Sequence, residues 1–135
     1  MEFSACVGVN SLGVWVVREF LDIKSKDTAF KGMPLGLERR YFINDGKVIC
    51  HHPYWPEEAF KDNDEKLIPK LENLNYESSE EIEFLTLETM KVAKLFDGYW
   101  SVDWMYVPEK GWYCIDMALG HKSYHWKTCN KNIVK

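Results

Sequence analysis

Two acidic residues, Asp103 and Asp116, lie in segments rich in aromatic and β-branched residues, which predicts a β-hairpin closed by the turn Pro108–Gly111. If Val107 faces Trp112 across this turn, the two acids lie directly opposite each other on one face, because side chains alternate along a strand. Two carboxylates about 5 Å apart repel each other unless a proton or a cation lies between them. The spacing therefore predicts a Mg²⁺ or Mn²⁺ site, and the alternative is that both acids face solvent at a sheet edge.

The composition indicates one folded domain, residues 1–135, because 46% of its 135 residues are hydrophobic and 15% are aromatic, enough for a sizeable core. Its net charge of −4 argues against a protein that coats nucleic acid or binds a membrane surface. No run of about 18 apolar residues is present, and Met1–Gly13 lacks the basic start and apolar centre of a signal peptide. We therefore expect a cytoplasmic protein.

Four cysteines are scattered along the chain without a Cys-x-x-Cys pair: Cys6, Cys50, Cys114 and Cys129. This pattern predicts reduced, mostly buried thiols rather than a zinc ribbon or a disulfide framework. His121, His125 and Cys129 are spaced by four residues and could bind zinc on a helical turn, with Cys114 or His51 as a fourth ligand. We favour surface or substrate-edge roles for the two histidines, since the cysteine pattern is not that of a zinc site.

The amino-terminal part of the chain supplies a strand and a second hairpin. The nearly apolar segment Val14–Ile23 predicts a strand in the centre of a sheet. Further along, Leu37–Ile43 and Lys47–His51 flank Asn44–Gly46, an Asn-Asp-Gly sequence typical of a tight hairpin turn. Together with the acidic hairpin, these segments predict a mainly antiparallel sheet.

The first arm of the second hairpin sorts its charges by face. A period of two places Glu38 and Arg40 on one side, where they can act on one pocket together, and Arg39 on the other side. Arg18 and Arg39 are both open to interpretation as simple solvated charges.

Two helices complete the expected fold. Ser79–Phe96 predicts a long helix, because Ser78 and Glu81 match a capping box and an apolar stripe follows. Asp62–Asn75 predicts a short helix with Pro69 in its first turn. The fold class is therefore α+β, a mainly antiparallel sheet with the long helix packed on one face and the charged residues of the candidate site on the opposite face.

Four segments, in this order and spacing, resemble the C-terminal, nucleotide-binding half of an ATP-grasp domain: Val16–Leu21, Glu38–Val48, Tyr99–Asp103 and Ile115–Gly120. The resemblance covers residues 14 to 126. It implies an ATP-grasp C-terminal subdomain and indicates that the small lobe expected upstream is absent from this chain.

The resemblance also assigns roles to residues. It implies that Asp103 and Asp116 hold Mg²⁺ (or Mn²⁺) against the phosphates of ATP, and that Arg40 is catalytic, contacting a phosphate or an acyl-phosphate intermediate. Glu19 and the backbone of the two residues after it would receive adenine, with Asp22 near the ribose. The cofactor-binding set implied in this way is Glu19, Phe20, Leu21, Asp22, Glu38 and Lys122.

The chemistry implied is carboxylate activation, in which ATP phosphorylates a substrate carboxylate and an amine or thiol attacks the acyl phosphate. Ala118 replaces the Asn usual in the last metal strand of the family, so one oxygen ligand is absent and the metal would either bind more weakly or have its shell completed by water. We expect a Mg-ATP-binding domain of a carboxylate–amine or carboxylate–thiol ligase type, incomplete for catalysis alone. It would be a fragment, a half-domain completed by a partner chain or a homo-oligomer, or a degenerate relative. The alternative is a non-catalytic interaction module that retains the fold.

Overall fold

The structure is a computed structural model that describes residues 17–29, 32–60, 65–127 and 129. The short helix predicted for Asp62–Asn75 is present from Ile68, with Pro69 in its first turn. The strands are β1 (Thr28–Ala29), β2 (Met33–Pro34), β3 (Glu38–Asn44), β4 (Lys47–Pro53), β5 (Tyr99–Val107) and β6 (Gly111–Leu119). The helices are α1 (Ile68–Leu74), α2 (Ser79–Ala93) and the 3₁₀ turns η2 (Glu57–Phe60), η3 (Glu65–Leu67) and η4 (Gly120–Lys122).

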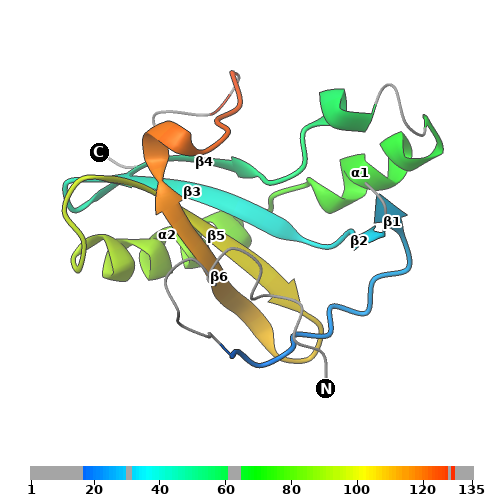
Figure 1. Ribbon diagram of the computed structural model, residues 1–135, viewed down its shortest axis with the longest axis horizontal. Coiled ribbons are helices and arrows are strands. Elements are labelled where there is room, and N and C mark those ends of the chain that lie inside the picture. The colour runs from blue at the N-terminus through cyan, green and yellow to red at the C-terminus, as the bar shows by residue number, and fades with distance from the viewer. Residues whose placement is uncertain (1–16, 30–31, 61–64, 128, 130–135) are drawn as a thin grey trace.

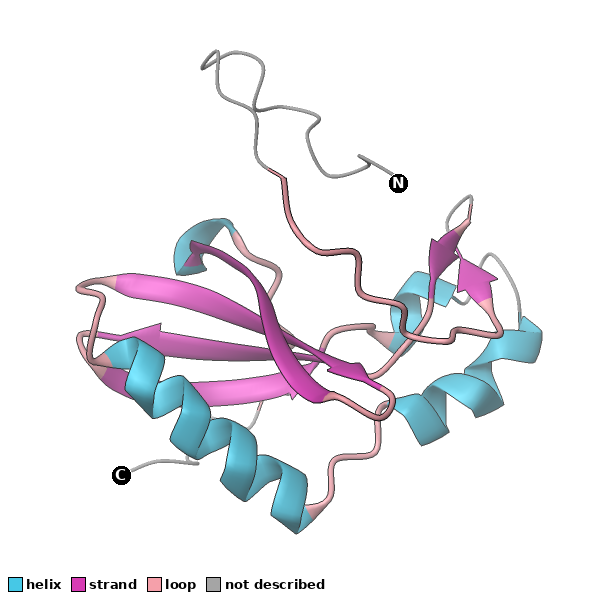
Figure 2. Ribbon diagram, turned by 90° about the horizontal axis from the view of Figure 1, so that it is seen from below, coloured by secondary structure: helices cyan, strands magenta, loops and turns pink. Residues whose placement is uncertain are grey.

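A four-stranded antiparallel sheet in the order β4-β3-β5-β6 forms the centre of the molecule (Figure 1). Helix α2 covers one face of this sheet (Figure 2), where Tyr41 and Ile43 of β3 and Val102 of β5 pack with Leu85 and Ala93 of the helix. The predicted α+β arrangement, a mainly antiparallel sheet with the long helix on one face, is confirmed. Since side chains alternate along β3, Arg40 and Phe42 lie on the opposite face.

The β3–β4 hairpin forms at the predicted Asn-Asp-Gly sequence. Asn44 pairs with Lys47, and the two residues between them, Asp45 and Gly46, have φ values of +46° and +84°. Two consecutive positive φ values define the tight turn whose twist matches that of paired strands, and Asp-Gly adopts it with little strain. The Asp45 carboxylate also accepts a hydrogen bond from Gly98 N at 3.1 Å, which ties this turn to the start of β5.

Helix α2 begins where the capping box predicts. Ser78 is the N-cap residue, and its hydroxyl oxygen accepts a hydrogen bond from Glu81 N at 3.1 Å. The helix ends at Ala93, three residues before the predicted end at Phe96, which is exposed. Among the residues described, no helix combines the length and the apolar character needed to cross a bilayer.

The predicted strand at Val14–Ile23 is wrong for the part that the structure describes, since residues 17–27 form no strand. Arg18 donates a hydrogen bond to Ile115 O of β6 at 2.7 Å, so the segment runs beside that edge strand. However, Val17 and Phe20 are 68% and 66% exposed. Apolar composition favours a strand only where other parts of the protein bury the side chains, and the side chains of Val17 and Phe20 are not buried. Residues 14–16 lie outside the described residues.

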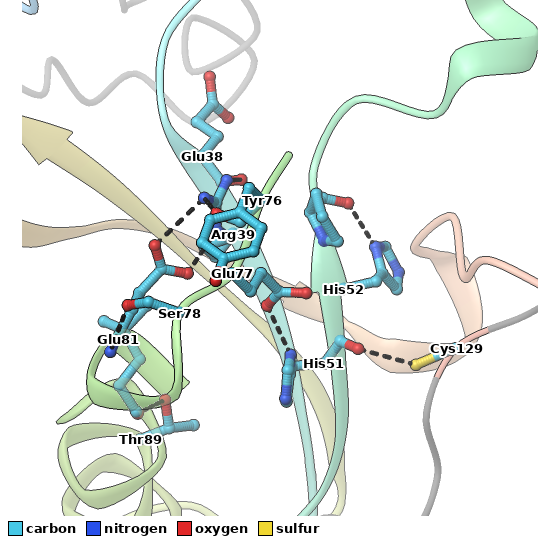
Figure 3. Close-up of polar contacts among 12 residues, drawn as sticks. Glu38, Arg39, His51, His52, Tyr76, Glu77, Ser78, Glu81, Thr89 and Cys129 are labelled. Atoms are coloured by element: carbon cyan, nitrogen blue, oxygen red, sulfur yellow. Dashed lines mark hydrogen bonds and ion pairs between the residues drawn. The ribbon is translucent and has the colours of Figure 1, made fainter. Parts of the chain in front are cut away.

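Arg39 is not a solvated charge, because its side chain is fully buried on the α2 face (Figure 3). Its Nε and Nη2 atoms donate to the two carboxylate oxygens of Glu81 at 2.7 and 3.2 Å. The remaining N–H groups donate to the carbonyls of Glu38, Leu74 and Tyr76 at 2.8 to 3.0 Å. All five donors of the guanidinium therefore have acceptors, as a buried charge requires. This single side chain joins β3 to the end of α1 and the start of α2.

Candidate functional site

A row of polar side chains crosses the sheet on the face opposite α2, with one residue from each strand. The strand register pairs His52 of β4 with Arg40 of β3, Arg40 with Asp103 of β5, and Asp103 with Asp116 of β6. Directly paired residues point to the same face of an antiparallel sheet. The row therefore brings together three of the predicted site residues, Arg40, Asp103 and Asp116, and adds a histidine.

Arg40 and Asp103 form the centre of this row as a two-pronged ion pair. Arg40 Nε and Nη2 donate to the two oxygens of Asp103, each at 2.8 Å. The side chains are 12% and 5% exposed, so the pair is largely removed from water. Arg40 Nη1 donates to the carbonyl of Tyr124 at 3.2 Å, and the guanidinium lies 4.8 Å from the ring centre of Tyr54. The arginine is thus held in one orientation by three residues.

Asp116 lies directly opposite Asp103, as predicted, although the register near the turn differs from the predicted one. Val107 pairs with Gly111 rather than with Trp112, which alone would have shifted the acids apart by one residue. A β-bulge between Asp103 and Trp104, where the pairing skips Ile115, restores the direct pair. Asp116 is exposed and its Oδ1 accepts a hydrogen bond from Met117 N at 2.9 Å. Repulsion between the two acids is relieved by the Arg40 guanidinium on Asp103, and the metal role of the pair stays a prediction.

Glu38 lies two residues from Arg40 on the same face and is only 8% exposed. Burial raises the pKa of its carboxyl from 4.5 to about 7, and the negative charge of Asp103 acts in the same direction, whereas Arg40 opposes it. Near neutral pH this carboxyl is therefore divided between its protonated and ionised forms. A nearby cation would shift it to the ionised form, which is the form that binds metal.

His52 closes the row as a neutral imidazole. Its Nδ1–H donates to the carbonyl of Pro53 at 2.6 Å (Figure 3). Its Nε2 accepts from Trp126 N at 3.3 Å, so both ring nitrogens have partners that fix one tautomer. The pKa of His52 is lowered to about 4, chiefly by burial, while the hydrogen bond to the Pro53 carbonyl opposes this shift and the positive charge of Arg40 contributes to it. Near neutral pH His52 is therefore uncharged, and Arg40 supplies the positive charge of the row.

The other predicted site residues lie outside this row. Glu19 contacts Lys110 Nζ at 3.3 Å and Asp22 contacts Lys24 Nζ at 2.9 Å, both on the exposed surface. Within the part of the chain that the structure describes, no hydrogen bond or ion pair joins the segment 19–22 or Lys122 to the row. Lys122 is exposed in η4, directly after β6. The nucleotide-binding roles of Glu19, Phe20, Leu21, Asp22 and Lys122 stay predictions.

Two groups that hold Arg40 were not found in the sequence. Tyr54, just beyond β4, places its ring against the guanidinium, and Tyr124 contributes a backbone carbonyl. A carbonyl contact has no residue-type signal, because any residue at position 124 offers the same oxygen. Tyr54 follows the strand that pairs with β3, but the register counted from the turn does not predict its place, because a register shift between Phe42 and Ile43 moves the pairing by one residue.

Comparisons with protein-family models, with curated proteins and with solved structures give no match to this chain. Its function is therefore argued from the geometry of the row.

Proposed function

We propose that this chain binds ATP together with Mg²⁺ or Mn²⁺ over the polar row of β3, β5 and β6, as the nucleotide-binding half of an ATP-grasp-like ligase. The observation that carries the proposal is the direct cross-strand alignment of Arg40, Asp103 and Asp116 on the sheet face opposite α2. A magnesium nucleotide presents a divalent cation and phosphate oxygens a few ångströms apart. Two carboxylates and one guanidinium on neighbouring strands offer the complementary charges.

The ion pair between Arg40 and Asp103 supports this proposal, because each residue could replace its present partner with a group of the magnesium nucleotide. Neither buried charge would then be left without a partner. Asp103 would release the guanidinium and bind the metal, while Arg40 would release the carboxylate and bind a phosphate oxygen. Breaking a buried pair by removing one partner costs about 3–5 kcal/mol, whereas here both charges keep a partner. Tyr54 and the Tyr124 carbonyl would hold the guanidinium in place during this exchange.

Asp116 and Glu38 would supply further oxygen ligands, and the free-energy cost of binding a metal differs between them. Asp116 is exposed, so its carboxylate loses little hydration on binding a metal. Glu38 is buried and partly protonated near neutral pH, and it would release its proton when a cation approaches. Since oxygen ligands suit Mg²⁺ and Mn²⁺, this donor set fits the proposed metals. Water would occupy the remaining positions.

The reaction that we propose for the complete system is phosphoryl transfer from ATP to a substrate carboxylate, followed by attack of an amine or a thiol. The metal would neutralise charge on the phosphates. Arg40 would stabilise the negative charge that builds on the transferred group, and the acids would position the nucleotide. Nucleotide binding is the step that involves the residues of the row directly, so it is the first test.

Isothermal titration of the chain with a non-hydrolysable ATP analogue, with and without Mg²⁺, tests the proposal. We expect binding that requires the metal and that weakens about tenfold or more in Asp116→Asn, because a negatively charged carboxylate ligand is replaced by a neutral amide. Glu83→Gln, an exposed acid on α2, is the matched control and should bind like the parent. Absence of Mg²⁺-dependent binding by the parent, or equal affinities of parent and Asp116→Asn, would contradict the proposal and favour the interaction module.

A further inference from the structure

Three metal-ligating side chains meet on the same sheet face, beside the polar row. The sulfur atoms of Cys50 and Cys129 and a ring nitrogen of His125 all lie within 4.8 Å of one another. Cys50 Sγ and His125 Nε2 are 3.0 Å apart. Cys50 belongs to β4, and the other two belong to the segment 120–129 that follows β6.

The spacing of these three atoms fits a tetrahedral metal. Zinc binds cysteine sulfur at about 2.3 Å and histidine nitrogen at about 2.0–2.1 Å, so neighbouring ligand atoms lie about 3.5–3.8 Å apart. Ligand atoms within 4.8 Å of one another reach this geometry with small side-chain adjustments. Two sulfurs and one imidazole nitrogen favour Zn²⁺ over the hard cations Mg²⁺ and Ca²⁺.

The surroundings of the three ligands hold them in place. Cys50 is 1% exposed and Cys129 is 8% exposed. The ring of His125 packs against Phe42 with centroids 4.3 Å apart, and Cys129 N donates to Trp126 O at 3.1 Å. Each of these contacts restricts a ligand before metal arrives, which lowers the entropy lost on binding.

The neighbouring histidines are engaged elsewhere. His52 uses both ring nitrogens for backbone partners, Pro53 O and Trp126 N. His51 points to the α2 face, where it stacks on Tyr41 and its Nδ1 lies 2.7 Å from Glu77 Oε2 (Figure 3). The protein ligands are thus limited to three in the described residues, which leaves one position of a tetrahedral ion for water.

We infer that Cys50, His125 and Cys129 bind Zn²⁺, with water as the fourth ligand, and that the ion fastens the segment 120–129 to β4. Binding releases a proton from each thiol, and Cys129 gives up the hydrogen bond that its thiol donates to His51 O at 3.3 Å. Two thiolates balance the charge of the ion, so the group is neutral and suits a buried position. The inference does not depend on the nucleotide proposal.

Metal analysis of the reduced, full-length chain tests this site directly. We expect a single zinc ion per chain, and after substitution by Co²⁺ the visible and near-ultraviolet bands of a tetrahedral site with sulfur ligands. Loss of a second-shell partner already weakens metal binding 10–100-fold, so Cys50→Ser and His125→Gln are expected to weaken it by more than about 100-fold. Cys114→Ser, at an exposed cysteine, is the matched control and should keep the affinity of the parent.

A second measurement uses the parent chain, so it tests the site even if the substituted variants do not fold. Alkylation of the folded protein, followed by mass mapping of each cysteine, should show that Zn²⁺ slows the modification of Cys50 and Cys129 while Cys114 reacts as before. Removal of the metal by a chelator should reverse this protection. The inference would be overturned if no zinc is bound or if the protection does not depend on zinc. It would also be overturned if Cys50 and Cys129 form a disulfide that persists under reducing conditions.

Discussion

Glu38 provides a quantitative test of the electrostatics of the polar row. Its carboxyl has a pKa of 4.5 in an unfolded chain and about 7 in the fold, chiefly because of burial. The folded state therefore binds the proton more tightly than the unfolded state. The stabilising effect of this proton is fully present below pH 4.5 and is lost as the pH rises through about 7. Glu38→Gln replaces the carboxyl with a neutral amide of similar shape and removes this pH dependence.

The expected magnitude follows from the two pKa values. Each pKa unit corresponds to about 1.4 kcal/mol, so the full difference between 4.5 and about 7 is worth about 3 kcal/mol. Between pH 5 and pH 8, where most of this change occurs, the parent should lose about 2.5 kcal/mol of unfolding free energy relative to Glu38→Gln.

Urea denaturation of the parent and of Glu38→Gln at pH 5, 6, 7 and 8 measures this difference. Comparing the two proteins at each pH cancels the contributions of groups that both contain. Glu83→Gln, an exposed substitution of the same chemistry, should remain parallel to the parent at every pH. If the difference between parent and Glu38→Gln is the same at pH 5 and pH 8, the carboxyl is not desolvated as argued, and its place beside the ion pair must be revised.

Three further predictions concern buried polar groups. Arg39→Met should lower the unfolding free energy by about 3–5 kcal/mol in urea denaturation, because it leaves the Glu81 carboxylate without its partner. Thr89→Val should cost about 1–3 kcal/mol in the same assay, since Trp104 Nε1 donates to the Thr89 hydroxyl at 3.0 Å and would lose its acceptor. His52, whose pKa falls from 6.5 to about 4 on burial, contributes stability that is full above pH 6.5 and lost as the pH falls through 4. Acidification from pH 7 to pH 5 should therefore destabilise the parent by about 2 kcal/mol more than His52→Gln, and equal pH dependence of the two proteins would contradict the neutral state assigned to His52.

The elements that could be predicted from the sequence are those fixed by local contacts. The turn at Asp45–Gly46 and the cap at Ser78 each depend on residues within three or four positions along the chain. The direct pairing of Asp103 with Asp116 was also predicted, although the predicted register at the turn was wrong by one residue. The bulge that corrects the register leaves no clear sequence signal, because it inserts an ordinary residue, Ile115, into the strand.

The features that could not be predicted depend on contacts between distant segments. The salt bridge of Arg40 with Asp103 joins residues 63 positions apart through the pairing of β3 with β5. The sequence leaves open that Arg39 is a solvated charge, because its acceptor Glu81 lies 42 positions away. A strand was predicted for Val14–Ile23 from its composition, which cannot indicate whether a sheet edge will accept it.

The cluster of Cys50, His125 and Cys129 also depends on a contact between distant segments, which the sequence does not predict. Spacing by four residues grouped His121 with His125 and Cys129, as on a helix. Where the structure describes this segment, it is helical only in the 3₁₀ turn Gly120–Lys122, so this spacing does not place the three side chains together. In the structure His121 is exposed, and the third ligand atom comes from Cys50, 75 positions before His125.

The polar row and the cysteine cluster are joined by three consecutive residues, 124 to 126. The carbonyl of Tyr124 accepts from Arg40, the ring of His125 contacts Cys50 Sγ, and Trp126 N donates to His52. A metal at Cys50 would therefore restrict the backbone that orients the central arginine of the row. This connection gives the two proposals an order of dependence: zinc binding needs no nucleotide, whereas the position of Arg40 depends on a segment that zinc would hold. Titration of nucleotide with and without zinc would measure that coupling.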